Sequence, residues 1–170
     1  MNQVYKIKKQ FIVPFMIAVA LLFVLWALSL CSGQTWEKII LAVLCVTTMV
    51  IAIEAYEREV TASEDGLRIK KFFRIKNFTW AEITHLGVVI MRNKAYFLLT
   101  TTKGFYMFSN LLQDHTGLIR HLAEKLGDEK VEVEIKNYLG NPIERTSLIV
   151  LTWIALMIIV AIILTKLVIL

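Results

Sequence analysis

Three long apolar segments constrain this chain more than any other feature of its sequence. They cover residues 11–30, 39–53 and 148–165, and none contains a charged residue. A helix needs about 20 residues to cross the hydrocarbon core of a bilayer, a length that the second segment reaches when it is extended to Tyr56. Three such helices among 170 residues would leave too little chain to cover them in a soluble protein. We therefore predict three transmembrane helices.

The lysines that flank these segments predict the orientation. Lys6, Lys8 and Lys9 precede the first segment, whereas the loop before the second carries only Lys38, beside an acid. Positive residues favour the cytoplasmic side, so we expect the N-terminal tail and the central segment inside, and the C-terminus outside. The sequence before Cys31 resembles a lipoprotein processing site only loosely, and we predict an uncleaved anchor.

The net charge of +5 is a topology signal and does not indicate nucleic-acid binding. Basic and acidic residues almost balance over residues 54–145, although eight bases stand against the single acid Glu82 over residues 66–103. The two cysteines, Cys31 and Cys45, are expected at different membrane depths, so we predict no disulfide. No metal or cofactor motif is present, and we predict no cofactor.

Short alternating segments separated by turn residues predict an antiparallel meander in the central part of the chain. We expect turns at Gly66, near residues 74–77, at 92–94 and at Gly104. Asp114 is a suitable cap for an amphipathic helix that ends at Gly127. The predicted strands cover residues 60–61, 67–70, 77–80, 85–91, 95–102, 105–109 and 131–136.

Several of these segments resemble the bacterial pleckstrin-homology-like family, in which such a domain often follows a pair of transmembrane helices. The resemblance covers about residues 57–127 and rests on three segments and the amphipathic helix. The segments are Val60-Thr61, Glu64-Asp65-Gly66-Leu67-Arg68-Ile69 and Phe78-Thr79-Trp80-Ala81-Glu82-Ile83. It implies an α+β fold: three transmembrane helices with a small antiparallel barrel or sheet domain, capped by the helix. It also implies a bacterial inner-membrane setting and no catalytic residues.

We divide the chain into three parts by composition. Residues 1–56 form a basic tail and a transmembrane hairpin, residues 57–137 the cytoplasmic domain, and residues 138–170 a juxtamembrane segment and the third helix. Within the domain, we expect Trp80 and Ile83 to be core residues at a corner of the sheet.

The residues do not suggest an enzyme, because the histidines are scattered and Ser109, Asp114 and His115 match a capped turn. The most suggestive feature is a basic hairpin. On a tethered domain it is suited to an anionic leaflet, although charges on a solvated strand also discourage edge pairing. The candidate contact residues are Arg68, Lys70, Lys71, Arg74 and Lys76.

Two functions stay open at this point. The leading hypothesis is a non-enzymatic membrane protein whose domain binds another protein, as a subunit or assembly factor of a membrane complex. The alternative is a module that binds anionic lipid head groups or senses the membrane. The expected partners are membrane lipids and a protein of that complex, without nucleic acid, and homo-oligomerisation is left open.

Overall fold

The computed structural model describes residues 3–92 and 94–169, and its chain separates into two compact units. One unit contains the residues up to Lys8 together with Glu57–Thr146, and we refer to it as the domain. The other contains Lys9–Tyr56 and the residues from Ser147 onward. The architecture is α+β, as predicted, with three long apolar helices and two small antiparallel sheets.

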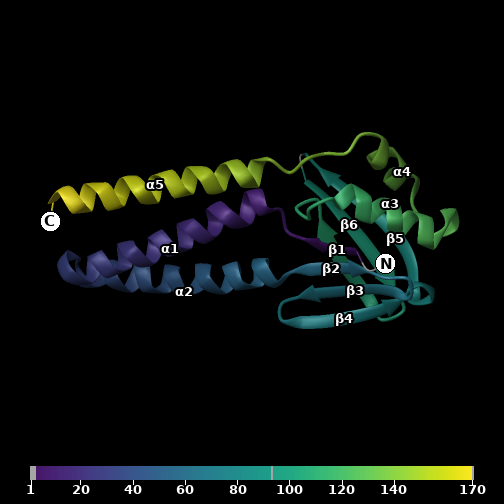
Figure 1. The fold of residues 1–170 in the computed structure, drawn as a ribbon, viewed down its shortest axis with the longest axis horizontal. Coiled ribbons are helices and arrows are strands. Elements are labelled where there is room, and N and C mark those ends of the chain that lie inside the picture. Colours follow the sequence, from purple (N-terminus) through teal and green to yellow (C-terminus); the bar gives the residue numbers. More distant parts are fainter. Residues whose placement is uncertain (1–2, 93, 170) are drawn as a thin grey trace. The chain divides into compact units, whose positions relative to one another are not determined.

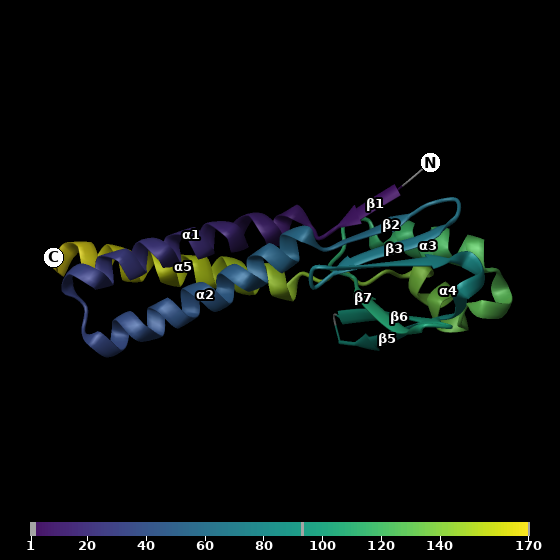
Figure 2. The same cartoon turned by 90° about the horizontal axis from the view of Figure 1, so that it is seen from below.

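The three long helices confirm the predicted apolar segments. They are α1 (Lys9–Ser32), α2 (Thr35–Glu57) and α5 (Ser147–Ile169), and each is long and apolar enough to span a membrane. Helix α1 lies along α5 (Figures 1 and 2). Near the C-terminal end of α5, the Lys166 ammonium group contacts the carboxylate of Glu37.

The first sheet has four strands in the order β1-β2-β3-β4 (Figure 1). Strand β1 (Gln3–Lys6) pairs antiparallel with β2 (Glu59–Ala62), and β3 (Gly66–Lys71) pairs with both β2 and β4 (Arg74–Thr79). Four residues of the predicted basic tail, Gln3–Lys6, thus form an edge strand of this sheet. The α1–α2 hairpin therefore connects two neighbouring strands of one sheet.

The second sheet has three strands in the order β5-β6-β7 (Figure 2). Strand β5 (Ile83–Met91) follows a short 3-10 helix, η1 (Trp80–Glu82), and pairs with β6 (Lys94–Thr101), which pairs with β7 (Gly104–Ser109). These strands lie close to their predicted positions. Among the described residues, the two sheets stay separate and do not close into one barrel.

Helix α3 (His115–Leu126) forms where the sequence predicted a helix, and Asp114 caps it by accepting a hydrogen bond from the Gly117 amide at 3.2 Å. The predicted strand at 131–136 is wrong. After η2 (Asp128–Lys130), the chain makes one parallel bridge at Val131 and then forms helix α4 (Val133–Gly140). Ile135 and Tyr138 are buried three residues apart, a helical spacing that the alternation of valines had hidden.

The core of the domain lies between the sheets and these two helices. Phe97 on β6 is fully buried, and its ring packs edge-on against Tyr138 of α4 at 5.2 Å between centroids. Ile83 is also fully buried, which confirms its predicted place in the core. Trp80 is only half-buried, because its indole N–H reaches out to donate a hydrogen bond to the Glu64 carbonyl oxygen at 2.8 Å.

Candidate functional site

The three connections between the domain and the long helices meet at one end of the domain, which we name the membrane-linked end. Strand β1 leads through Lys8 into α1, α2 ends at Glu57 just before β2, and the chain reaches α5 through Arg145. The Lys8 amide donates to the Leu111 carbonyl oxygen at 3.0 Å, and the Lys8 ammonium contacts Glu144. These contacts hold the first and third connections together within the domain.

The basic β3–β4 hairpin turns at this same end. Lys70 lies opposite Glu59 in the pairing of β2 with β3, and its ammonium group lies 3.2 Å from the carboxylate of Glu57. The guanidinium of Arg58 lies 5.9 Å from the centre of the Phe72 ring. The hairpin tip is therefore beside the residue at which α2 ends.

The five predicted contact residues do not share one face of the hairpin. Side chains alternate along a strand, and the register places Lys71 opposite Arg74 and Ile69 opposite Lys76. Lys71, Arg74 and Lys76 therefore share a face with buried Ile69. Arg68 and Lys70 lie on the other face, and only Lys70 of these two is close to the tip.

Two aromatic residues that are not among the predicted contact residues form the tip itself. Phe72 and Phe73 are the two central residues of the turn, with φ of 50° and 58°, and each is 62% exposed. A two-residue turn with both φ values positive is type I′, which strongly prefers Asn-Gly. The left-handed conformation costs a bulky residue about 1 to 2 kcal/mol. The signal in the sequence was a pair of phenylalanines between charged residues, just before the turn that we had placed near residues 74–77.

The β5–β6 hairpin adds positive charge at the membrane-linked end. Met91 pairs with Lys94, and Tyr96 pairs with Ser109, whose strand ends beside the Lys8 connection. The side chains of Arg92 and Lys94 are exposed there. Asn93, the middle residue of the predicted turn, lies outside the described residues.

A narrow apolar cleft separates the two sheets at this end, and Arg58 and Lys71 are among the residues that line it. Its free volume is about 20 Å³, which is space for a single water molecule. A lipid head group cannot enter a cleft of this size. Arg58 and Lys71 therefore cannot bind a head group inside this cleft.

Two larger hollows lie elsewhere. A groove of about 400 Å³ at the opposite end of the β3–β4 hairpin mixes Arg68 and Lys103 with Asp65 and Glu82, so it offers no single sign of charge. Lys103 lies 2.5 Å from Glu82, and this contact lowers the pKa of the Glu82 carboxyl group.

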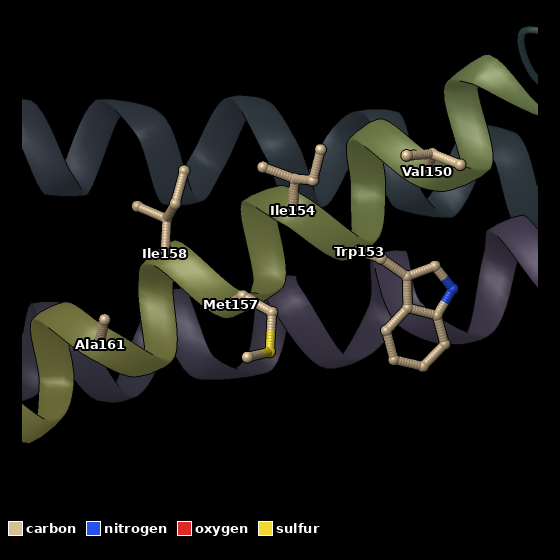
Figure 3. A pocket seen from close by; sticks show the side chains of 6 residues that line it. All are labelled: Val150, Trp153, Ile154, Met157, Ile158 and Ala161. Atoms are coloured by element: carbon tan, nitrogen blue, oxygen red, sulfur yellow. The ribbon is translucent and has the colours of Figure 1, made fainter.

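The other hollow is an apolar surface of α5, bordered by Trp153 and Met157 (Figure 3). It is formed by α5 alone and presents almost no polar atoms. On a helix that spans a membrane, such a surface is suited to lipid chains and to other apolar helices.

The histidines lie in three different surroundings. His85 contacts Glu132 at 2.8 Å between Nε2 and Oε1, and His121 packs edge-on against Trp80. His115 is buried beside Phe97 and Tyr138. Burial, followed by the charge of Lys8, lowers the pKa of His115, and burial raises the pKa of Tyr138 to about 12.

Three residues that are close in sequence, Ser109, Asp114 and His115, have structural roles in the domain. Asp114 caps α3, and the Ser109 hydroxyl accepts a hydrogen bond from Arg145 at 3.4 Å. Within residues 3–92 and 94–169, no group of three or more potential ligands from His, Cys, Asp and Glu could hold a metal ion. Comparisons with protein-family models, curated proteins and solved structures found no match to this chain.

Proposed function

We propose that this chain is a non-enzymatic integral membrane protein whose domain rests on the anionic surface of the membrane and binds lipid head groups there. The observation that carries the proposal is the gathering of exposed and half-buried cations at the membrane-linked end, around a hairpin tip beside the end of α2. Each Lys or Arg near an anionic leaflet contributes about 1 kcal/mol. Lys71, Arg74 and Arg92 together are enough to hold a tethered domain against such a surface.

The pairing of β1 with β2 supports the proposed topology. Residues 3–6 and 59–62 are neighbours in one sheet, although the whole α1–α2 hairpin lies between them in sequence. They must therefore lie on the same side of a membrane that α1 and α2 cross. With the lysine bias before α1, this pairing supports the proposal that the domain lies in the cytoplasm of a bacterial cell and the C-terminus outside.

The proposed fold class is the pleckstrin-homology-like domain of the sequence resemblance. Two antiparallel sheets followed by the amphipathic helix α3 fit what that resemblance implies. The buried face of α3 is formed by Leu118, Ile119 and Leu122, which pack into the domain. We infer a domain in which the membrane hairpin replaces the connection between the first two strands.

A protein partner is a second candidate, and one surface favours it. The outer face of the β5–β7 sheet carries exposed apolar side chains, of which Phe105 is 81% and Met107 49% exposed. Met107 pairs with Leu98 of β6, so the surface continues across strands. Such a face is suited to the apolar centre of an interface, with a subunit of a membrane complex or with a second copy of this chain.

Crosslinking to lipid tests the lipid proposal in the full chain. The protein is reconstituted in nanodiscs that contain a photoreactive phosphatidylserine, and the crosslinked peptides are located by mass spectrometry. We expect crosslinks in residues 66–79 and a steep loss with added salt, because exposed charges are screened beyond about 8 to 10 Å. The double variant Lys71→Gln/Arg74→Gln should reduce the yield on the order of tenfold.

The matched control removes two exposed cations of α3, in Arg120→Gln/Lys125→Gln, and should leave the yield unchanged. Equal crosslinking by a photoreactive neutral lipid, without salt dependence, would contradict lipid head-group binding. A partner that copurifies in mild detergent and is lost in Phe105→Ser/Met107→Ser would favour the second candidate.

A further inference from the structure

The tip of the β3–β4 hairpin has an unfavourable sequence for its own geometry. Both central residues of the turn need positive φ, a conformation that Asn and Gly adopt readily and phenylalanine does not. Phe72 and Phe73 nevertheless occupy these positions, and both rings are largely exposed. The turn therefore presents two large apolar side chains where a polar pair would fold more easily.

The surroundings of the two rings match the border between lipid head groups and acyl chains. Lys71 and Arg74 flank the turn directly, and the Lys71 ammonium lies 5.3 Å from the centre of the Phe72 ring. Aromatic rings favour that border, and basic residues beside them favour lipid phosphates.

The position of the tip is also suitable for contact with the membrane. Glu57 is the last residue of α2, and the Lys70 ammonium contacts its carboxylate at 3.2 Å. Only one residue, Arg58, separates Glu57 from β2, and a residue extends the chain by at most about 3.6 Å. The tip therefore lies beside the residue that joins α2 to the domain.

We propose that Phe72 and Phe73 form a membrane wedge, a turn whose rings insert into the interface of the bilayer that the long helices span. The inference rests on the proposed lipid function, since the neighbouring cations bring the tip to the surface. It goes further in assigning the apolar part of the contact to two residues. It also explains why an unfavourable turn sequence is present.

Quenching by lipids tests the insertion. In a Cys31→Ser/Cys45→Ala background, an environment-sensitive fluorophore is attached to Ile75→Cys, two residues from the tip, or to Asp65→Cys at the opposite end of β3. The full chain is placed in anionic nanodiscs that carry a nitroxide high on the acyl chain. We expect quenching at position 75 to exceed that at position 65 by at least twofold.

The decisive variant is Phe72→Asn/Phe73→Gly, which keeps every charge and gives the turn its preferred sequence. We expect it to lose the excess quenching and to unfold at a higher urea concentration, so loss of quenching cannot result from misfolding. Phe72→Trp/Phe73→Trp is the matched control and should retain the quenching.

Unchanged quenching in the Asn-Gly variant would overturn the wedge, and so would a lower urea midpoint. A different result would assign the rings to a protein partner. In that case the parent protein would show no quenching in nanodiscs, and the tip would be protected from hydrogen exchange only in native membranes. Crosslinking of anionic lipid distinguishes the two proposals. If the wedge alone is wrong, the Asn-Gly variant still crosslinks in a manner that depends on salt and on Lys71 and Arg74.

Discussion

Strand β3 begins after a turn at residues 63–65 and ends at a turn formed by Phe72 and Phe73, so one strand offers two turns for comparison. In the first turn, the Ser63 amide and hydroxyl both donate to the Gly66 carbonyl oxygen at 2.9 Å. In the second, two exposed aromatic residues adopt left-handed backbone angles. The first turn follows local preferences and the second does not. Departures from such preferences tend to mark function, and this one lies beside the end of α2.

The largest change in the free energy of unfolding is expected at Gly66, which follows the first turn. A Cβ atom on Gly66 would lie 1.9 Å from the backbone carbonyl oxygen of Phe78, which cannot move aside as a side chain can. Gly66→Ala should therefore lower the free energy of unfolding by about 3 kcal/mol. Pulse proteolysis of the full chain in urea measures this loss. Gly140→Ala is the control, because nothing lies within 4 Å of its Cβ, and equal losses in the two variants would refute the explanation.

At the second turn, we expect a substitution to raise the free energy of unfolding. Phe72→Asn/Phe73→Gly removes two left-handed phenylalanines, so it should raise the free energy of unfolding by about 2 kcal/mol in detergent. The same pulse proteolysis measures the gain. A loss of stability would mean that the rings support the fold, and the contrast between the two turns would then have no functional meaning.

A smaller loss of stability is expected from the hydrogen bond between Trp80 and the first turn. The Trp80 indole N–H donates to the Glu64 carbonyl oxygen at 2.8 Å, and Trp80→Phe removes this bond while keeping an aromatic ring. We expect a loss of about 1 kcal/mol. Hydrogen exchange should become faster at residues 63–65 and stay unchanged at the second turn. Equal changes at both turns would show that Trp80 acts on the whole sheet.

The smallest effect concerns pH at the membrane-linked end. Burial lowers the pKa of His115 below its ordinary value of 6.5. The unfolded chain therefore takes up a proton at a higher pH than the folded domain does, and stability should fall as the pH drops below about 6.5. His115→Phe should reduce this fall in urea midpoints measured at pH 7.5 and 5.5. His121→Gln, on the half-buried side of α3, should not, and an identical fall in His115→Phe would contradict the assignment.

Local sequence patterns predicted much of this fold because most of its elements are built from local signals. Apolar length predicted the three long helices, short segments between turn residues predicted β5 to β7, and the Asp114 cap predicted α3. Strand β1 was missed because its partner follows the whole membrane hairpin. Helix α4 was missed because Val131, Val133 and Ile135 alternate like a strand, and only tertiary packing buries Tyr138 beside Ile135.

The candidate site was predicted only in its charges. The sequence identified the basic residues of the hairpin but not their division between two faces, which depends on the register of β3 with β4. It also placed the turn near residues 74–77, since phenylalanines are common in strands. The membrane-linked end could not be found from sequence alone, because Lys8, Arg58 and Arg145 are distant along the chain and meet only in the folded domain.

Hydrogen exchange at the two turns of β3 tests the central claim most directly. The full chain is compared in nanodiscs of neutral lipid and of lipid with about one-third anionic head groups, at low ionic strength, where surface charges act most strongly. We predict slower exchange at residues 71–75 in the anionic discs, no change at residues 63–66, and loss of the difference in Lys71→Gln/Arg74→Gln. Equal exchange at residues 71–75 in both lipids, or protection at residues 63–66 instead, would contradict the proposal that the membrane-linked end rests on the anionic surface.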